Sequence, residues 1–312
     1  MTTTTVLVPT WRRPEDLRRC LAALSAQTVV PGEILVVARS DDAETGSVLA
    51  SLAAEGPIRT TAVPVDAPGV VASINAGLDA ATGDVVLITD DDAVPHPDWL
   101  ARIVRTFAER PGAGGVGGRD WVRHEGRLVD GRAERVGKLR WFGRLVGDHH
   151  LGTGGPREVD VLKGVNMAFR RRALDGVRIS TALRGRGAQA HWEVDLCLAV
   201  RRRGWTLIYD PEIAVDHFPA PRHDAPRRRL LTPAALADEV FNQTYGLLRG
   251  LPWWRKPIVF GYGLVVGTTQ APGPVCALVE TLRGRRVGAL TWTATRARAG
   301  ALTAYGRRRA AR

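Results

Sequence analysis

Short apolar runs alternate with helix-like stretches over the first 90 residues of the chain. Aliphatic and β-branched runs predict buried strands, and apolar residues at helical spacing predict helices between them. We expect strands at residues 3–9, 33–38, 59–64 and 84–89, and helices at 14–26, 43–54 and 70–81. Because strands and helices alternate, the pattern predicts right-handed crossovers and an α/β fold with a mostly parallel sheet flanked by helices.

The middle of the chain is patterned less regularly. The spacing predicts helices at 98–110 and 191–203, and a last strand at 205–209 that stops before a proline. Residues 119–158 are polar and weakly periodic, which predicts long loops. The run at 112–118 contains a Gly-x-Gly-x-x-Gly match, but no strand precedes it and no helix follows it, so a dinucleotide site is not indicated.

The last part of the chain, residues 226–312, has a different character, so we expect a main domain at 1–225 and a helical C-terminal extension. The apolar stretch 257–279 is interrupted by glycines, prolines and a glutamine, whereas a transmembrane helix needs about 20 continuous apolar residues. Trp253 and Trp254 precede it and an arginine-rich tail follows it. Two interpretations remain open: a segment at a membrane surface, or a helical flap packed on the main domain.

Charge is concentrated at the end of the chain. The net charge is +12, yet residues 281–312 hold nine arginines and no acid, so residues 1–280 carry only +3. The tail therefore predicts contact with an anionic membrane surface rather than a nucleic-acid partner. The start of the chain lacks the pattern of a signal peptide, and the three cysteines are far apart. We expect a cytoplasmic protein, peripheral at the inner face of the membrane, without a disulfide framework.

Candidate chemistry lies where the predicted strands end, because parallel sheets bind ligands at the carboxyl ends of their strands. Polar groups follow three strands there: Pro9-Thr10-Trp11, residues 39–42 and Asp90-Asp91-Asp92. Adjacent carboxylates repel one another unless a cation offsets them. Asp90 and Asp92 point the same way in an extended chain, so they can share one Mg²⁺ or Mn²⁺ whose shell is completed by substrate phosphates. The alternative is a solvated acidic loop or helix cap.

Five segments together resemble the family 2 glycosyltransferases, which are inverting nucleotide-sugar transferases with the Rossmann-like GT-A fold. The matching segments, which follow the order of the family, are 6–24, 75–100, 164–171, 191–205 and 209–218. The resemblance implies a nucleotide-sugar-binding half at 1–118 and an acceptor and catalytic half at 119–225. It also implies that Asp90 and Asp92 form the family's Asp-x-Asp site for metal and diphosphate.

The same resemblance implies roles for further residues. Glu193 falls where the family places its catalytic base, which deprotonates the acceptor hydroxyl, and Asp195 is the alternative base. His217 matches a histidine that some members use as a third metal ligand. The expected donor-binding residues are Pro9, Thr10, Arg12, Arg39, Asp42, Asn75, Asp90, Asp91, Gly164 and Asn166.

Two departures from the family pattern affect the site. Ala38 stands where the family commonly has an aspartate that contacts the base, so we expect Arg39 to stack on the base or pair with phosphate and Asp42 to take the base contact. Glu193 replaces the family's aspartate and is one methylene longer. These changes leave the nucleotide and the sugar open.

The resemblance therefore implies a metal-dependent, inverting transfer of a sugar from a nucleotide-diphosphate donor to a hydroxyl acceptor. We expect the acceptor, whose identity the sequence leaves open, to be a saccharide or a lipid-linked molecule of cell-envelope, polysaccharide or glycolipid synthesis. One alternative is an inactive scaffold of the same fold. Another is a nucleotidyltransferase, which normally has a glycine-rich loop after the first strand, and residues 10–14 lack glycine. A nucleic-acid-binding protein would leave the three aspartates unexplained.

Overall fold

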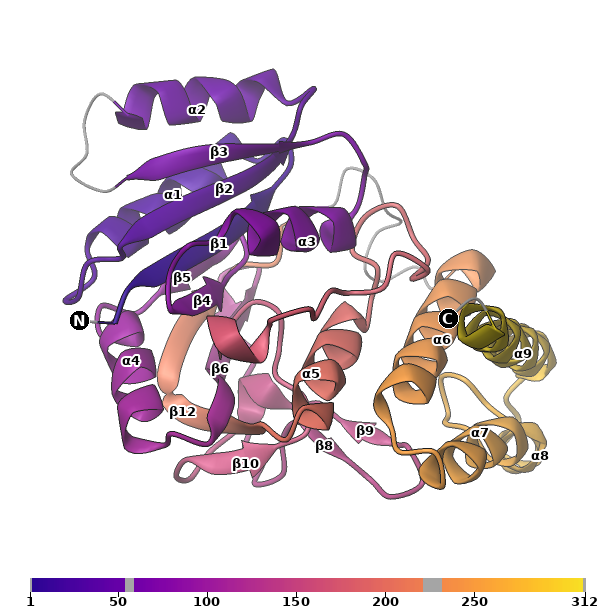
Figure 1. Ribbon diagram of the computed structural model, residues 1–312. Helices are drawn as coiled ribbons and strands as arrows, with labels where there is room; N and C mark the ends of the chain where they lie inside the picture. Colours follow the sequence, from indigo (N-terminus) through magenta and orange to yellow (C-terminus); the bar gives the residue numbers. More distant parts are fainter. Residues whose placement is uncertain (1, 54–58, 221–231, 311–312) are drawn as a thin grey trace.

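The computed structural model describes residues 2–53, 59–220 and 232–310, and the expected domain boundary at residue 225 lies outside these ranges. A ten-stranded sheet runs through the molecule in the order β10-β12-β6-β11-β4-β1-β2-β3, with β5 paired to β12 and β7 to β6. Helices cover both of its faces (Figure 1). The expected α/β architecture is therefore confirmed.

The N-terminal half follows the predicted alternation closely. Strands β1 (Thr4–Thr10), β2 (Glu33–Arg39), β3 (Thr60–Val65) and β4 (Val85–Ile88) pair in parallel. They alternate with helices α1 (Pro14–Ser25), α2 (Ala43–Ala53) and α3 (Val70–Ala80). Because these strands run in one direction, their carboxyl ends meet at one edge of the sheet, as the position of the polar groups predicted.

The second half adds strands of both directions. Strand β11 (Met167–Arg170) lies antiparallel between β4 and β6 (Ala113–His124), and β12 (Thr206–His217) runs parallel to β6. Helices α4 (Trp99–Glu109) and α5 (Trp192–Arg202) connect this part. The smaller elements are β5 (Ala93–Pro95), β7 (Arg127–Leu128), β8 (Lys138–Leu139), β9 (Leu145–Val146), β10 (Arg157–Val159), and the 3₁₀ turns His149–Leu151 and Arg171–Ala173.

Two expectations about the middle of the chain are wrong. The loop expected from residue 119 is in its first part the end of β6, because the glycines at 114–118 let this strand pack closely between its neighbours. An added Cβ at Gly118 would lie 1.8 Å from the carbonyl oxygen of Ile213. The last strand does not stop at 209: β12 continues through Pro211, where a register shift between Asp210 and Ala214 accommodates the missing N–H.

The core has two parts, one on each face of the sheet. Successive residues of β1 point to opposite faces, so Val6 and Val8 belong to one cluster and Leu7 to the other. The cluster around Leu7 also contains Trp192 of α5 and extends into the C-terminal helices. The strands of the sheet are thus held by apolar packing on both sides.

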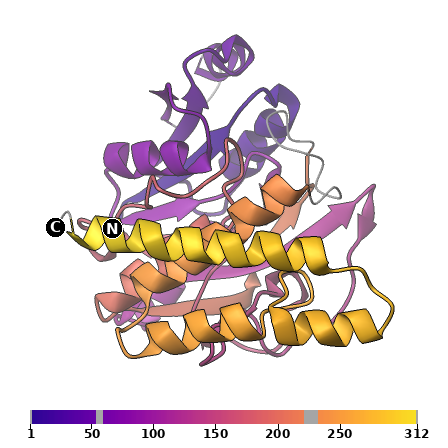
Figure 2. The ribbon, with the colours of Figure 1, turned by 90° about the vertical axis from the view of Figure 1, so that its right-hand side faces the viewer.

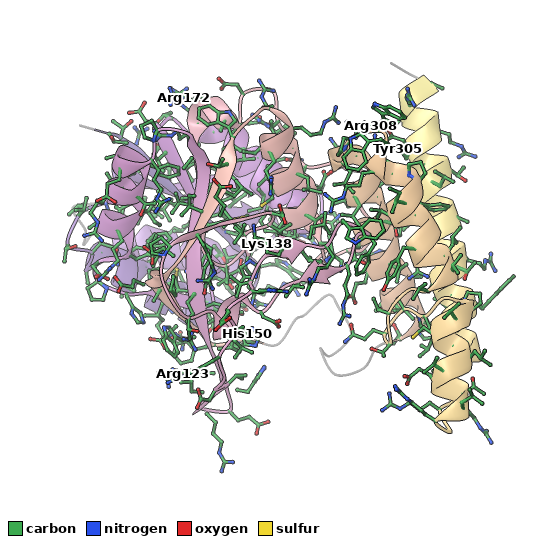
Figure 3. The ribbon with its side chains drawn as sticks, turned by 90° about the horizontal axis from the view of Figure 1, so that it is seen from below. Arg123, Lys138, His150, Arg172, Tyr305 and Arg308 are labelled. Atoms are coloured by element: carbon green, nitrogen blue, oxygen red, sulfur yellow. The ribbon has the colours of Figure 1, made fainter. Side chains whose placement is uncertain are left out.

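The C-terminal extension consists of helices, as expected. They are α6 (Pro233–Gly250), α7 (Arg255–Val265), α8 (Pro274–Leu282) and α9 (Gly288–Ala310). Helix α6 packs on α5, and α9 lies along α6 and buries Ala294, Ala297 and Ala301 (Figures 1 and 2). Tyr305 and Arg308 of α9 face the main domain, where Arg308 donates a 2.7 Å hydrogen bond to Ser180 Oγ (Figure 3).

Helix α6 thus joins the extension to the main domain through α5, whereas both interpretations of residues 257–279, which form α7 and part of α8, stay open. Helices α7 and α8 lie at the outer edge of the molecule (Figure 2). Within the described ranges, we find no helix that is both long enough and apolar enough to cross a membrane.

Candidate active site

Polar residues from three strand ends meet in one crevice at the carboxyl edge of the sheet. Pro9, Thr10, Arg39 and the three aspartates 90–92 line it, as the strand-end argument predicted. The other lining residues are Trp11, Arg13, Gly69, Val70, Ser73, Gly187, Ala188 and Trp192. The crevice therefore combines carboxylates, arginines and aromatic rings in one place.

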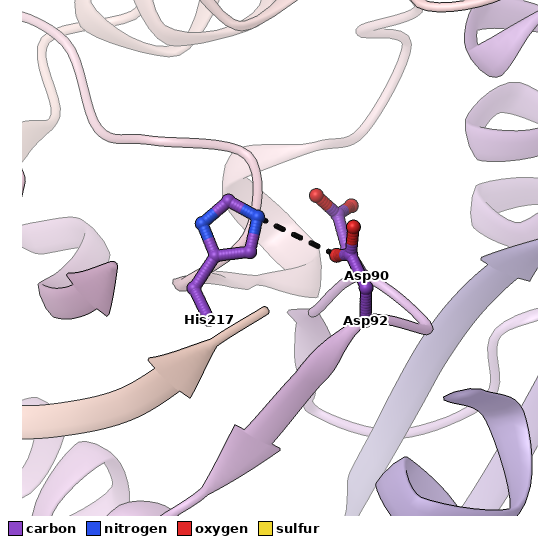
Figure 4. Close-up of side chains that lie close together, drawn as sticks. All are labelled: Asp90, Asp92 and His217. Carbon is purple, nitrogen blue, oxygen red and sulfur yellow. Dashed lines mark ion pairs between the residues drawn. The ribbon is translucent and has the colours of Figure 1, made fainter. Parts of the chain in front are cut away.

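The acidic run and the last strand form a candidate metal site. One ligand atom each from Asp90, Asp92 and His217 lie within 4.8 Å of one another (Figure 4). The pairing of β12 with β5 places His217 opposite Ala93, which brings the imidazole beside the aspartates. His217 Nε2 lies 3.5 Å from Asp92 Oδ1, and within the described ranges neither buried atom has a hydrogen-bond partner. Carboxylate and imidazole ligands aimed at one point fit a divalent cation such as Mn²⁺ or Mg²⁺.

A buried carboxylate orients the histidine from its other side. Asp120 of β6 is fully buried, lies 3.3 Å from His217 Nδ1 through Oδ2, and is ion-paired with Lys163. Burial opposes a charge on the imidazole, but the hydrogen bond with Asp120 and the negative charge of Asp92 raise the pKa of His217 to about 9. Asp120 thus holds Nδ1 and leaves Nε2 facing Asp92, which is the usual arrangement behind a metal-bound histidine.

Asp91 is paired within the protein rather than with the metal cluster. Its carboxylate accepts hydrogen bonds from Thr10 Oγ1 at 2.7 Å and from the Arg13 guanidinium at 2.9 Å. Burial, opposed by Arg13, raises the pKa of Asp91 to about 7. Arg13 also lies 3.8 Å from Asp92, so this side chain brings positive charge to the acidic run. Arg12 has a left-handed backbone conformation, with φ 54°, and its backbone N–H donates a hydrogen bond to the Asp42 carboxylate.

Three of the expected donor-binding residues make structural contacts outside the crevice lining. Asp42 accepts hydrogen bonds from Arg12 N–H and from Thr45, at the start of α2. Asn75 exchanges two hydrogen bonds with the backbone of Ile179. Asn166 is fully buried; it accepts a hydrogen bond from Trp99 Nε1 and donates to the carbonyls of residues 119 and 213. These side chains fix the loops around the crevice.

Two other expected residues shape the crevice wall. An added Cβ at Gly164 would lie 2.6 Å from the Trp192 ring, so glycine is required for this indole to take its place in the crevice. The Arg39 guanidinium lies 5.1 Å from the centre of the Trp11 ring, and Arg12 lies on the same ring at 5.2 Å. A planar, positively charged surface therefore stands at the end of β2.

The two acids in the first turn of α5 have different surroundings. Glu193 is half-buried and follows Trp192, which lines the crevice. Asp195 is buried, accepts a 2.8 Å hydrogen bond from Ser180 N–H and is ion-paired with Arg249. Asp195 lines a larger cavity, of about 610 Å³, between α5 and the C-terminal helices, and this cavity has none of the clustered metal ligands. The candidate metal ligands Asp90 and Asp92 instead line the smaller crevice.

Three residues of the site were not predicted from the sequence: Arg13, Asp120 and Lys163. Arg13 stood in the polar loop after the first strand, so its position was a usable signal. Asp120 and Lys163 lay in stretches without periodicity, and only the pairing of β6 with β12 brings Asp120 beside His217.

Comparison with known proteins points to one family. The family described as "Glycosyltransferase like family 2" matches residues 2–232. The glucosyl-dolichyl phosphate glucuronosyltransferase of Haloferax volcanii is 29% identical over 216 residues, which cover 66% of this chain and 65% of that protein. Glycosyltransferase AglE of the same organism is 27% identical over 105 residues, covering 33% of this chain and 34% of its own length. The chain thus spans less than two thirds of either relative.

Solved structures of low sequence identity share the fold. The mannosyltransferase PcManGT from Pyrobaculum calidifontis, in complex with GDP-Man and Mn²⁺, has a TM-score of 0.52 and 18% identity, covering 97% of this chain and 86% of its own. S. aureus TarS 1–349, in complex with UDP-GlcNAc, has a TM-score of 0.57 and 14% identity, covering 84% of this chain and 72% of its own. The resemblance and the GT-A fold expected from the sequence motifs are confirmed.

Proposed function

Since the chain belongs to glycosyltransferase like family 2, we propose that it moves a sugar from a nucleotide-diphosphate donor to an acceptor hydroxyl, with inversion and with a divalent cation. The observation that carries this proposal is the cluster of Asp90, Asp92 and His217, which has two unsatisfied buried atoms and of which Asp90 and Asp92 line the crevice at the carboxyl edge of the sheet. The name of the Haloferax volcanii relative supports a lipid-linked acceptor.

In this proposal, Asp90, Asp92 and His217 hold the cation. When bound, the cation supplies positive charge that stabilises the departing diphosphate. Arg13 adds a fixed charge beside Asp91 and Asp92. The surface formed by Arg39 and Trp11 receives the nucleotide base.

Glu193 is the proposed general base. Its carboxylate takes the proton of the acceptor hydroxyl while that oxygen forms a bond to the anomeric carbon and the bond from that carbon to the diphosphate oxygen breaks. The surroundings support Glu193 over Asp195, because Asp195 is committed to Ser180 and Arg249 on the side of the C-terminal helices. Asp195 then has a structural role at the start of α5.

A binding experiment tests the metal site directly. We expect one of UDP, GDP or dTDP to raise the melting temperature of the protein only when Mn²⁺ is present. Asp92→Asn keeps an acceptor for the N–H of Ala220, so it preserves the local backbone contact, and we expect it to remove the Mn²⁺-dependent rise. An Asp92→Asn variant with the full response would contradict the assignment.

Turnover of the donor identified in this way tests the base. We expect Glu193→Gln to lower kcat by about 10²–10⁴-fold without changing the nucleotide-induced rise in melting temperature. Asp195→Asn is the matched comparison: we expect it to lower stability, because it weakens the pair with Arg249, and to retain more turnover than Glu193→Gln. The reverse order of activities, at equal stability, would make Asp195 the base.

A further inference from the structure

Helix α8 exposes its apolar residues to solvent and buries its acidic residue, which is the reverse of an ordinary surface helix. Its apolar residues Val275, Leu278, Val279 and Leu282 recur at helical spacing on one face, and that face is exposed to solvent: Leu278 is 63% and Leu282 80% exposed. Its acid, Glu280, is 1% exposed and is ion-paired with two arginines that follow the helix. An exposed apolar row of this kind is typical of a surface that binds a membrane, a ligand or another protein.

Helix α7 extends the same kind of surface. Trp254, Ile258 and Val265 lie on one face of this helix by their spacing, and all three are exposed. Trp253 is 81% exposed beside them. Helices α7 and α8 follow one another along the outer edge of the molecule, next to α9 (Figure 2). We call the exposed apolar residues of α7 and α8, with Trp253 and Trp254, the α7–α8 face.

The segment that carries the α7–α8 face is strongly basic. Residues 251–310 carry ten basic side chains and one acid, Glu280, which is buried. Arg283 and Arg285 keep 66% of their side chains exposed while they pair with Glu280, and Arg286 is exposed next to them. Other arginines of the tail are used inside the protein: buried Arg298 donates to the carbonyl of Ala271, and Arg308 to Ser180.

We infer that the α7–α8 face docks on an anionic lipid bilayer, with α7 and α8 lying in the plane of the interface. A bilayer offers hydrocarbon to the apolar row and lipid phosphates to the arginines, and exposed tryptophans favour the boundary between the two. A second copy of the chain would bring its own arginines against Arg283, Arg285 and Arg286, so charge disfavours pairing of two such faces. In this inference, α7 and α8 form the surface that binds the bilayer, and the rest of the arginine-rich tail does not.

Vesicle flotation of the full chain tests this inference. We expect binding to vesicles of equal parts phosphatidylglycerol and phosphatidylcholine, and weak or no binding to pure phosphatidylcholine. The double variant Leu278→Gln/Leu282→Gln removes two exposed leucines and is expected to lower the partition coefficient by at least about tenfold. Arg286→Gln is expected to lower it by a few fold, with a loss that disappears at high salt. The readout is binding alone, so it is independent of the proposed transferase activity.

Exposed residues far from the α7–α8 face provide matched controls. Val29→Gln/Val30→Gln changes two exposed apolar residues in the loop after α1, and Arg105→Gln an exposed arginine of α4; both are expected to bind like the wild type. Absence of wild-type binding to the anionic vesicles would overturn the inference. Undiminished binding of the leucine double variant would also overturn it. A wild-type dimer that the leucine double variant converts to a monomer, without lipid binding, would assign the face to a second copy instead.

Discussion

At the scale of single residues, Asp120 decides which nitrogen of His217 faces the carboxylates. It is fully buried on β6 and contacts Nδ1, while Nε2 lies toward Asp92. Asp120 does not belong to the metal cluster itself, so it is a positioning residue. Burial opposes a charge on Asp120, but the hydrogen bond with His217 and the ion pair with Lys163 lower the pKa of this carboxylate.

Asp120→Asn is expected to weaken Mn²⁺ binding by about 10–100-fold, because a histidine without its carboxylate partner is a poorer and less well-oriented ligand. The measurement is a titration of Mn²⁺ followed by the melting temperature at fixed nucleotide. Asp216→Asn is the control: this residue is next to His217 in the sequence but pairs with His96 and Arg123. Equal Mn²⁺ affinities for the two variants would show that Asp120 does not orient the ligand.

His149 gives the protein a dependence of stability on pH. Burial is the main cause that lowers the pKa of His149 to about 4, while Nε2 is 2.9 Å from the carbonyl oxygen of Val161. The unfolded chain takes up this proton near the ordinary value, so the free energy of unfolding is expected to fall as pH drops from about 6.5 to about 4, by up to about 3 kcal/mol. Above this range, both states are neutral at this residue and the effect is absent.

Urea unfolding at several pH values checks this expectation. His149→Gln, which has no titrating ring, is expected to show a flatter loss of stability over the same range. His124→Gln removes an exposed histidine and is expected to follow the wild type. Parallel curves for wild type and His149→Gln would contradict a buried neutral histidine.

At the scale of elements, the glycine-rich strand β6 brings two parts of the site together. Gly118 is packed against the backbone of residues 210 and 213, just before β6 and β12 continue toward Asp120 and His217. Close approach of the two backbones therefore sets the distance between the positioning carboxylate and the histidine.

Gly118→Ala is expected to destabilise the protein by about 1–3 kcal/mol or more, since its Cβ would meet two backbone carbonyls that cannot move freely. It should also weaken the Mn²⁺ response by displacing β12. Gly112→Ala is the matched control, because an added Cβ there meets nothing within 4 Å. Thermal unfolding compares the two variants. Equal melting temperatures would mean that the register shift between Asp210 and Ala214 accommodates the added methyl group at little cost.

The same elements show what the sequence revealed and what it did not. Alternating patterns predicted β1 to β4 and placed Asp90 and Asp92 at the edge of the sheet, because both follow from local periodicity and from the parallel connection rule. Glycines hid β6, since they carry no side chain whose alternation signals a strand. Pro211 is a local signal for the end of a strand, but pairing with β6 carries β12 past it. The contact between Asp120 and His217 depends on the register of β6 against β12, which local sequence patterns do not encode.

At the scale of the whole molecule, one hydrophobic cluster joins the first strand to the last helix. Leu7 of β1 and Ala301 of α9 belong to the same buried cluster, together with Trp192 beside the proposed base. The C-terminal helices thus complete the core on one face of the sheet. We expect the described part of the chain to unfold in one cooperative transition.

Ala301→Leu is expected to lower the stability of the whole chain by about 1–3 kcal/mol, because three added carbons have no room between α9 and its neighbours. Ala299→Leu on the exposed side of the same helix is expected to be nearly neutral. Thermal unfolding followed by tryptophan fluorescence and by far-ultraviolet circular dichroism checks both variants. Two separate transitions for Ala301→Leu would show that the extension unfolds independently.

The position of His217 on the last strand of the sheet has a consequence for biosynthesis. Asp92 and Ala220, which share a hydrogen bond at the candidate metal site, are separated by 128 residues in the chain. A ribosome therefore exposes the aspartates long before it makes the strand that supplies His217, the third candidate ligand. Chains interrupted before this strand carry the acidic run without its histidine, so only molecules whose sheet is complete hold the whole candidate metal site.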